Sequence, residues 1–547
     1  MKRKKIFLVG LLSVIVLGLS AFYTSDKYFE ITRNLDIFVS LFKEVNAFYV
    51  DDIDPEKSIR TSIDAMLGTL DPYTVYIPEE DFADYLTMTT GEYGGIGALI
   101  TEIDGKVVIT MPNEGFPAHK AGIKIGDHIT NINGTNTIGK SSTEVSKLLK
   151  GTSGTDITIK VNRQGEEIEF NLKRAKIIID NVPYYGIVND SIGYIKLNEF
   201  TTNAAKEVKN ALLSLKKDGA KKIILDVRGN PGGILQEAVA ICNLFIPKNK
   251  SVVETKGKTP NWNKIYRTSN KSIDKNIPLA VLTSSRSASA AEIVAGTLQD
   301  YDRGVLVGTK TFGKGLVQTT RPVGYNSKVK ITVAKYYTPS GRCIQAIDYA
   351  HRNLDGSVGK IPDSLIVAFK TENGRTVYDG GGITPDVKVT AEYFSPIAIE
   401  LMREGYVFNY ATKYYYEHPE APDMHSFEIS DEVYADFSKW INGSELEYDN
   451  ELEQAIVEFE EKLVETSQFE SLKLTLEELK SEVIHNQAED LIKFQDEIRD
   501  VLAAQIVSRY SLAKGEIANS LKNDPDVLKA IEILNSPEEY KALLSSK

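Results

Sequence analysis

Short apolar segments alternate with longer amphipathic segments between Tyr184 and about Val389. The short segments have the length and composition of buried strands, and the longer ones repeat apolar residues at helical spacing. Alternation of this kind builds a layered α/β domain whose sheet is partly parallel. The expected strands are Ile192–Leu197, Lys222–Val227, Leu279–Leu282 and Val305–Val307, and the expected helices are Ala204–Lys216, Leu235–Leu244 and Ala290–Gln299.

The remaining sequence is too long to belong to that domain alone. A chain of 547 residues predicts about three or four domains. With 42% hydrophobic and 26% charged residues, large cores are possible and extensive disorder is not expected. The net charge of −12 argues against a nucleic-acid-binding protein, which would need to neutralise phosphates.

Cysteine and histidine give no sign of a metal site or a disulfide framework. Cys242 and Cys343 are the only cysteines, and we expect them to stay unpaired. The six histidines form no HExxH motif and no cluster with cysteine. We therefore expect no metal and no other cofactor.

The N-terminus has the features of a targeting segment. The residues MKRKK precede an apolar stretch from Ile6 to Tyr23, and positive charge before an apolar stretch directs the rest of the chain across a membrane. The stretch is longer than a usual signal-peptide core, and no cleavage site is obvious. Residues 1–25 are predicted to be an uncleaved signal anchor, or alternatively a cleaved signal peptide. In both cases the body is expected in the cell envelope, on its periplasmic or extracytoplasmic side, membrane-anchored or secreted.

Two regions have the periodicity of helices. In the N-terminal helical region, residues 26–88, apolar residues from Ile37 to Phe48 recur at spacings of three and four. The C-terminal helical region, residues 391–547, is rich in Glu and Lys and also has apolar residues at helical spacing. We expect most of its helices to cover a core of their own. Formation of a homo-oligomer through these helices is the second interpretation.

Residues 89–176 have the sequence pattern of short strands and turns, including the Asn133-Gly134 hairpin signal. This region resembles a PDZ domain at Pro117-Ala118, Ala121-Gly122-Ile123, Gly126-Asp127 and Ile132-Asn133-Gly134. The resemblance implies that Gly95, Ile96, Gly97 and Ala98 form the loop that binds a peptide's terminal carboxylate through backbone N–H groups, while the neighbouring strand edge pairs with the peptide. The alternative is that this glycine-rich loop is only a turn.

Four serines follow the expected strand Leu279–Leu282. They are Ser284, Ser285, Ser287 and Ser289, and they stand where a helix begins. Serines at such a junction often only cap the helix. A second strand-to-helix loop, DVRGNPGG at Asp226–Gly233, lacks the lysine and the hydroxyl residue of a phosphate-binding P-loop. Its backbone N–H groups are instead suited to an oxyanion hole beside a serine nucleophile.

No histidine stands in a context that would make it the base for such a serine. Lys310 and Lys314 follow the strand Val305–Val307 and are the two candidates. An ordinary lysine has a pKa near 10.4, so burial must lower the pKa by about 2 to 3 before the amine can accept a proton at neutral pH. Gln318 is neutral and could orient the amine without raising its pKa. The alternative is that the lysine and the glutamine are a surface pair.

Together these segments resemble the carboxyl-terminal processing, or tail-specific, serine proteases. The resemblance rests on LDPYTVYI, DVRGNPGG, SASAAEIVAGTLQD, VGTKTFGKGLVQ, KYYTPSGRCIQ and GGITPDV, which occur in this order. It implies a crotonase-like or ClpP-like protease core with an inserted PDZ domain. The site residues that it implies are the nucleophile Ser289, the base Lys314, the orienting Gln318 and, in the oxyanion hole, the backbone N–H groups of Ala290 and of Gly232 or Gly233.

The resulting prediction is a multidomain α/β protein with a PDZ domain. Its predicted parts are the signal segment 1–25, the N-terminal helical region 26–88, the PDZ domain 89–176, the protease core 177–390 and the C-terminal helical region 391–547. The predicted function is a serine endopeptidase with a Ser–Lys dyad that cleaves proteins at or near exposed C-termini.

The expected partners are protein or peptide substrates, with no nucleic acid, and the membrane if the N-terminal segment is not cleaved. The alternatives are a catalytically inert PDZ adaptor that binds peptides and a lysine-assisted hydrolase of small acyl substrates.

Overall fold

The computed structural model describes residues 28–353, 355–390, 394–441, 446, 451–464, 468–483 and 487–546. The predicted signal segment, residues 1–25, lies outside the described residues. No helix in the described ranges combines the length and the apolar character needed to span a membrane. Residues 28–76 with 329–331 make one compact unit, and the other described residues make a second.

The first unit is helical, as the periodicity predicted. Residues 28–48 are one helix, and α2 (Pro55–Gly68) follows. Asp54 is the N-cap of α2, where its side chain accepts a hydrogen bond from the backbone N–H of Lys57 over 3.1 Å. The apolar side chains of residues 28–48 are largely exposed, including Phe38, Leu41 and Phe48.

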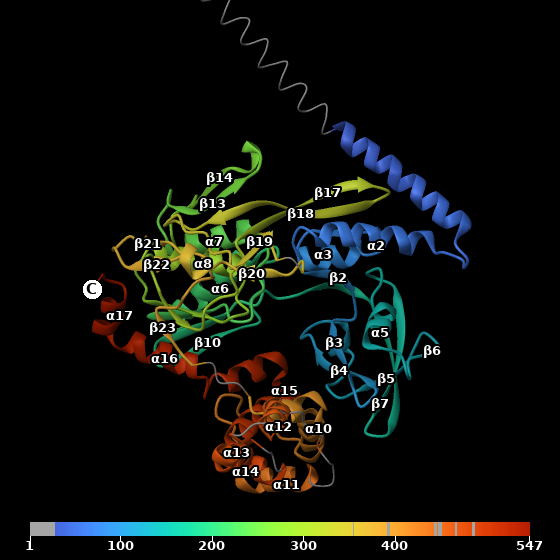
Figure 1. Ribbon diagram of the computed structural model, residues 1–547. Helices are drawn as coiled ribbons and strands as arrows, with labels where there is room; N and C mark the ends of the chain where they lie inside the picture. The colour runs from blue at the N-terminus through green and yellow to red at the C-terminus, as the bar shows by residue number, and fades with distance from the viewer. Residues whose placement is uncertain are drawn as a thin grey trace, which may run out of the picture. The chain divides into compact units, whose positions relative to one another are not determined.

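The second unit contains a six-stranded sheet in the order β10-β11-β12-β15-β16-β23. Figure 1 labels its two edge strands, β10 and β23. Its first strand is antiparallel to its neighbour, and the remaining pairs are parallel. The strands are β10 (Tyr184–Asn189), β11 (Ile192–Lys196), β12 (Lys222–Asp226), β15 (Leu279–Thr283), β16 (Val305–Gly308) and β23 (Val387–Lys388). The predicted partly parallel α/β sheet is thereby confirmed.

Both faces of this sheet are buried, which is why its strands are continuously apolar. On one face, Ile223 and Leu225 of β12 pack in a core with α6 (Ala204–Lys217), α7 (Leu235–Phe245) and α8 (Ala290–Asp300). On the opposite face, Ile224 packs in a second core with α16 (Pro525–Asn535). The short helix α17 (Pro537–Leu543) follows and contributes Tyr540 to the same core.

Beside the central sheet lies a second, antiparallel sheet. In it β18 (Ser327–Tyr337) pairs with β17 (Leu316–Gly324) and β13 (Ser251–Gly257), and β13 pairs with β14 (Lys264–Arg267). Strand β1 (Val75–Ile77) falls where the first unit ends in the sequence. The smaller elements of the second unit are α3 (Phe82–Thr90), β19 (Ile347–Arg352), β20 (Val358–Lys360), β21 (Ala368–Lys370), β22 (Thr376–Tyr378) and the 3-10 turns Pro260–Trp262 and Asp363–Leu365.

The PDZ-like region forms an antiparallel sheet in the order β3-β4-β5-β7-β8, with β6 paired to β5. Its first and last segments, β2 and β9, pair with each other, so the module enters and leaves the chain through one two-stranded ribbon. The predicted Asn133-Gly134 turn joins β5 to β6, and both residues have positive φ. The elements are β2 (Glu92–Gly95), β3 (Ala98–Ile103), β4 (Lys106–Pro112), α4 (Pro117–Lys120), β5 (His128–Ile132), β6 (Thr135–Asn136), α5 (Ser142–Leu149), β7 (Asp156–Arg163), β8 (Glu166–Lys173) and β9 (Ala175–Ile178).

The C-terminal helices divide between two cores. As predicted, most of them surround a core of their own, which is built around Tyr410, Phe437 and Ile506. Helix α16 is an exception, because its apolar residues are buried against the central sheet. The helices before α16 are α9 (Pro396–Arg403), α10 (Tyr406–Glu417), α11 (Asp431–Ile441), α12 (Glu451–Val464), α13 (Phe469–Val483), α14 (Gln487–Lys493) and α15 (Gln495–Ser520).

Helix α15 is interrupted between these two cores. Leu512 has φ 53° and ψ −153°, a conformation that does not occur within a helix and that non-glycine residues rarely adopt. Ile506, before the break, belongs to the core of the helical region. Ala518, after it, belongs to the core that contains α16 and the central sheet. The break therefore marks where the chain leaves one core for the other.

Candidate active site

Ser289 stands between β15 and the first turn of α8, in a backbone conformation that serine rarely adopts. Its φ is 56° and its ψ is −112°, and such a conformation costs about 1–3 kcal/mol unless the surroundings enforce it. The Ser289 carbonyl accepts a hydrogen bond from the Tyr336 hydroxyl over 3.1 Å. A strained serine at a strand-to-helix turn is a recurring arrangement for a nucleophile, because the turn exposes the hydroxyl beside the helix N-terminus.

The other serines of the cluster differ from Ser289 in their surroundings. The buried Ser287 donates its hydroxyl to the Val227 carbonyl over 2.7 Å and accepts the Ser284 N–H over 2.9 Å. The hydroxyl of Ser284 accepts the N–H of Gly229 over 3.1 Å. Ser285 is exposed. Ser284 and Ser287 thus tie this turn to the Asp226–Gly233 loop, and Ser289 is the serine of the four with positive φ.

The Asp226–Gly233 loop packs directly on Ser289. A Cβ atom on Gly232 would lie 2.7 Å from the Ser289 Cβ and 2.9 Å from the Ala290 nitrogen, so only glycine fits. The φ of Gly232 is +100°, which also favours glycine. The Ala288 N–H donates to the Asn230 carbonyl over 2.9 Å. The two loops that the sequence paired as nucleophile and oxyanion hole are therefore in contact.

The backbone N–H groups predicted for the oxyanion hole differ in whether they already donate a hydrogen bond within the protein. The Gly232 N–H donates to the side-chain oxygen of Asn230 over 2.8 Å, so it is already used within the loop. Across the described ranges, the N–H groups of Ala290 and Gly233 have no hydrogen-bond acceptor in the protein. Ala290 is the first residue of α8, where the helix leaves its N–H groups unpaired.

The two candidate lysines occupy different environments. Lys310 is exposed, and its ammonium lies against the backbone of Gly381, where a Cβ would be 2.7 Å from Nζ. Lys314 is half-buried between Gly313 and Gly315. The φ of Gly313 is +87°, and a Cβ there would lie 2.5 Å from the Ala346 Cβ. This tight turn holds the backbone of Lys314 beside α8.

A buried carboxylate that the sequence analysis did not single out joins the predicted nucleophile to the predicted base. Glu292, fully buried in the first turn of α8, accepts the Ser289 N–H and the Lys314 N–H on the same oxygen, Oε2, each over 2.9 Å. The two backbone nitrogens therefore cannot be farther apart than twice 2.9 Å. The spacing Ser-x-x-Glu is that of a capping box, which is the signal that could have pointed to this residue.

The other oxygen of Glu292 is equally occupied. Oε1 accepts the Thr311 hydroxyl over 2.6 Å and the Gly313 N–H over 2.8 Å. Burial raises the pKa of Glu292 to about 7, although the hydrogen bonds from Thr311, Lys314, Gly313 and Ser289 act to lower it. These four donors, three backbone N–H groups and one hydroxyl, are all neutral.

Gln318, the predicted orienting residue, lies on β17, and its side-chain amide donates to the Thr332 hydroxyl of β18 over 3.1 Å. This bond fixes the Gln318 side chain between the two strands. Its role toward Lys314 stays a prediction.

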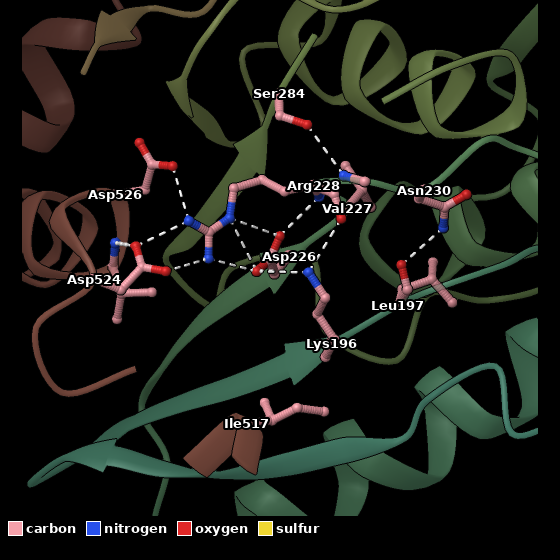
Figure 2. A network of polar contacts seen from close by, with 12 residues as sticks. Lys196, Leu197, Asp226, Val227, Arg228, Asn230, Ser284, Ile517, Asp524 and Asp526 are labelled. Carbon is pink, nitrogen blue, oxygen red and sulfur yellow. Dashed lines mark hydrogen bonds and ion pairs between the residues drawn. The ribbon is translucent and has the colours of Figure 1, made fainter. Parts of the chain in front are cut away.

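A network of charged groups surrounds the start of the Asp226–Gly233 loop (Figure 2). The buried Asp226 carboxylate accepts hydrogen bonds from the Tyr194 hydroxyl, the Lys196 ammonium and the Arg228 guanidinium. Burial alone would raise the pKa of Asp226, but the charges of Arg228 and Lys196 outweigh this effect and hold the pKa well below its usual range. Lys196 also donates to the Arg228 carbonyl over 3.1 Å.

The predicted carboxylate-binding loop, Gly95, Ile96, Gly97 and Ala98, joins β2 to β3. With α5 it lines a cavity of about 950 Å³. The Ile96 carbonyl accepts the Ala118 N–H over 2.9 Å, and the Gly97 carbonyl accepts the Asn113 N–H over 2.8 Å. The carbonyl side of the loop is thus tied to the PDZ core, as a loop that presents its N–H groups to a peptide requires.

Cys242 is buried and Cys343 is half-buried, and they do not form a disulfide. Among the described residues no group of three or more His, Cys, Asp or Glu side chains is arranged to hold a metal ion.

Three segments of the chain match known families. Residues 191–351 match peptidase family S41, residues 94–173 match the PDZ domain, and residues 397–534 match a probable PDZ-protease, C-terminal helical domain. A probable CtpA-like serine protease of Staphylococcus haemolyticus is 31% identical over 421 residues, which are 77% of this chain and 75% of the relative. The chain belongs to the CtpA-like serine proteases of peptidase family S41.

This membership confirms the family resemblance and the fold class, a protease core with a PDZ domain and a helical C-terminal region. The likeness of the core to crotonase or ClpP stays a prediction. A CtpA-like relative from Staphylococcus aureus (strain N315) is 39% identical over 57% of this chain, and the chain spans 62% of that relative's length. Among solved structures, the photosystem II D1 C-terminal processing protease is 27% identical, with 64% of this chain and 92% of that chain covered and a TM-score of 0.34.

Proposed function

We propose that the chain is a serine endopeptidase in which Ser289 is the nucleophile and Lys314 is the general base. The observation that carries this proposal is the single Glu292 oxygen that accepts both the Ser289 N–H and the Lys314 N–H. It keeps the two backbones adjacent, with Ser289 at the N-terminus of α8 and in contact with Gly232. Membership in the CtpA-like serine proteases supports the same reaction class.

In the proposed reaction, Ser289 Oγ attacks the scissile carbonyl carbon while its proton passes to a neutral Lys314 Nζ. The lysine then gives this proton to the leaving amide nitrogen as the C–N bond breaks, and an acyl-enzyme ester remains. Water attacks the ester, its proton passes through the same amine back to Ser289 Oγ, and the acid product leaves. The N–H groups of Ala290 and Gly233 would stabilise the oxyanion of each tetrahedral intermediate, whereas that of Gly232 is already bonded to Asn230.

The PDZ domain is proposed to select the substrate. Consecutive N–H groups at Gly95–Ala98 would bind the terminal carboxylate of an unstructured protein tail, and the exposed edge of β3 would pair with the tail as an added strand. Cleavage would then occur at or near that C-terminus. We further propose that the protein acts in the cell envelope, because a basic and apolar N-terminal segment precedes the described part of the chain.

Four variants test the assignment of the dyad. Ser289→Ala and Lys314→Ala should each reduce cleavage of an unfolded protein with an apolar tail by at least about a thousandfold, because both groups act in the same step. The matched controls are Ser285→Ala, at the exposed serine of the cluster, and Lys310→Ala, which should keep most of the activity. The same substrate with an amidated C-terminus should be cleaved more slowly by the unaltered enzyme if the tail's carboxylate is bound.

Full activity in Ser289→Ala or Lys314→Ala would refute the dyad. If the unaltered protein binds the tail but cleaves nothing, the inert adaptor is the correct function. If it hydrolyses a small ester but no peptide, it is the small-substrate hydrolase.

A further inference from the structure

Arg228 links the active-site loop to the C-terminal helical region. Its guanidinium donates to Asp226 at the end of β12, with Nη2 2.8 Å from Oδ2. From the other side it meets two carboxylates that lie almost 300 positions further along the chain (Figure 2). Nη1 lies 2.9 Å from Asp524 Oδ1 and 2.8 Å from Asp526 Oδ2, and Nη2 lies 2.8 Å from Asp524 Oδ2.

These contacts are shielded from water. Arg228 and Asp524 are each 18% exposed at the side chain, Asp526 is 17% exposed and Asp226 is fully buried. A planar guanidinium that engages three carboxylates through several N–H groups has a fixed orientation, which a surface pair does not have.

The two distant carboxylates are themselves held in place. Asp524 is the N-cap of α16 and also accepts the Val527 N–H over 3.0 Å. Asp526 lies in the first turn of the same helix. Val527, Ala530 and Ile533 are fully buried in the core that α16 shares with the central sheet. The start of α16 is therefore a rigid support for Arg228.

Arg228 is only a few residues from the predicted oxyanion glycines. Its own N–H donates to Asp226 over 2.8 Å, and the next N–H, that of Gly229, donates to Ser284. Asn230 binds the Leu197 carbonyl through its side chain and the Ala288 N–H through its carbonyl. A change in the position of Arg228 is thus passed on, through a short loop held by these hydrogen bonds, to the glycines beside Ser289.

We propose that Asp524 and Asp526 are positioning residues of the protease. They hold Arg228 from the side opposite Asp226 and so fix the Arg228–Gly233 loop in the place where it faces Ser289. The C-terminal helical region thereby supplies a necessary part of the active-site support, although neither carboxylate touches the reacting atoms. This inference rests on the Ser289–Lys314 reaction proposed above.

The test replaces the carboxylates of Asp524 and Asp526 by amides in the whole chain. Asn keeps the N-cap function and nearly the same volume, so Asp524→Asn/Asp526→Asn removes charge with little change in shape. The matched control is Asp500→Asn: Asp500 accepts the Asn523 side-chain amide over 2.8 Å, immediately before Asp524, and is not a partner of Arg228. Each variant is assayed for kcat and KM on a tailed protein, for the rate at which a fluorophosphonate labels Ser289, and for Tm.

For the double variant we expect kcat to fall by about tenfold or more, with KM changed less than about threefold and slower labelling of Ser289. The control should match the unaltered enzyme. Asp526→Glu, which keeps the charge, should retain more activity than Asp526→Asn. Asp526→Asn leaves the Asp524 N-cap unchanged, so this single variant replaces the double variant in the test if the double variant does not fold.

The double variant could instead have a lower Tm but an unchanged kcat and an unchanged labelling rate at temperatures below its unfolding transition. Asp524 and Asp526 would then only stabilise the fold, and the proposal would be overturned. A failure of the underlying reaction is distinguishable, because the unaltered enzyme would then be inactive or Ser289→Ala would be active.

Discussion

Two buried carboxylates belong to the segments of the candidate site, Asp226 at the start of the Asp226–Gly233 loop and Glu292 in α8, and they are held in opposite ways. Asp226 is surrounded by cations, and its pKa lies well below the usual range because of Arg228 and Lys196. Glu292 accepts four hydrogen bonds from neutral donors, and burial raises its pKa to about 7. The Asp226 carboxylate balances the positive charges of Arg228 and Lys196. The Glu292 carboxylate instead holds backbone N–H groups, including those of Ser289 and Lys314. Of these two carboxylates, Glu292 is therefore the one that changes its protonation near neutral pH.

The largest effect is expected at the charge-balanced carboxylate. Asp226→Asn leaves Lys196 without its buried counter-charge and removes one of the carboxylates bound to Arg228. Removing one partner of a buried pair costs about 3–5 kcal/mol. Urea unfolding should therefore show a lower free energy of unfolding by about this amount, and a variant as stable as the unaltered protein would contradict the charge-balance interpretation.

A smaller effect is expected from pH. The pKa of Glu292 is near 4.5 when unfolded and about 7 when folded, so the folded state binds more protons between these values. Stability from this group is therefore fully present below about pH 4.5 and declines until about pH 7, by about 3 kcal/mol in total. Asp226, whose folded pKa is lowered, adds no slope in this window and loses its contribution only in stronger acid. Unfolding at pH 5 and pH 8 measures the difference.

The smallest effect on stability at neutral pH is expected for Glu292→Gln. The amide avoids the cost of a buried charge, but it places an N–H group against N–H donors, at about 1–3 kcal/mol. These terms partly cancel, so the net change at pH 8 should be below about 2 kcal/mol and the slope between pH 5 and pH 8 should be reduced. Activity should still fall by about tenfold or more, because the shared acceptor of Ser289 and Lys314 is weakened. An active Gln variant with the original pH slope would show that Glu292 has neither role.

The sequence was most informative for features that depend on residues close together in the chain. Strands such as Lys222–Asp226 were predictable because burial on both faces requires a continuous apolar run. The pattern could not choose among the four serines, since Ser284 and Ser287 are distinguished by partners at Gly229 and Val227 that only the fold brings near. The family resemblance was needed to single out Ser289.

The contribution of α16 could not be predicted from its own sequence. Asp524-Pro525-Asp526 is a typical helix start, and its apolar stripe fits any helical core. Nothing in these residues indicates Arg228 or the face of a sheet formed far earlier in the chain. Glu292 was missed for the opposite reason, because its capping spacing was visible but its second partner, Lys314, comes from another loop.

The coverage of the central sheet by α16 has a consequence for the order of folding during synthesis. The strands β12, β15 and β16 are made well before α16, so one apolar face of the sheet has no cover until the intervening helical region has been produced. A nascent chain at that stage exposes a surface that favours aggregation. It also lacks the two aspartates that hold Arg228, so on this account the chain gains full proteolytic competence only when α16 has docked.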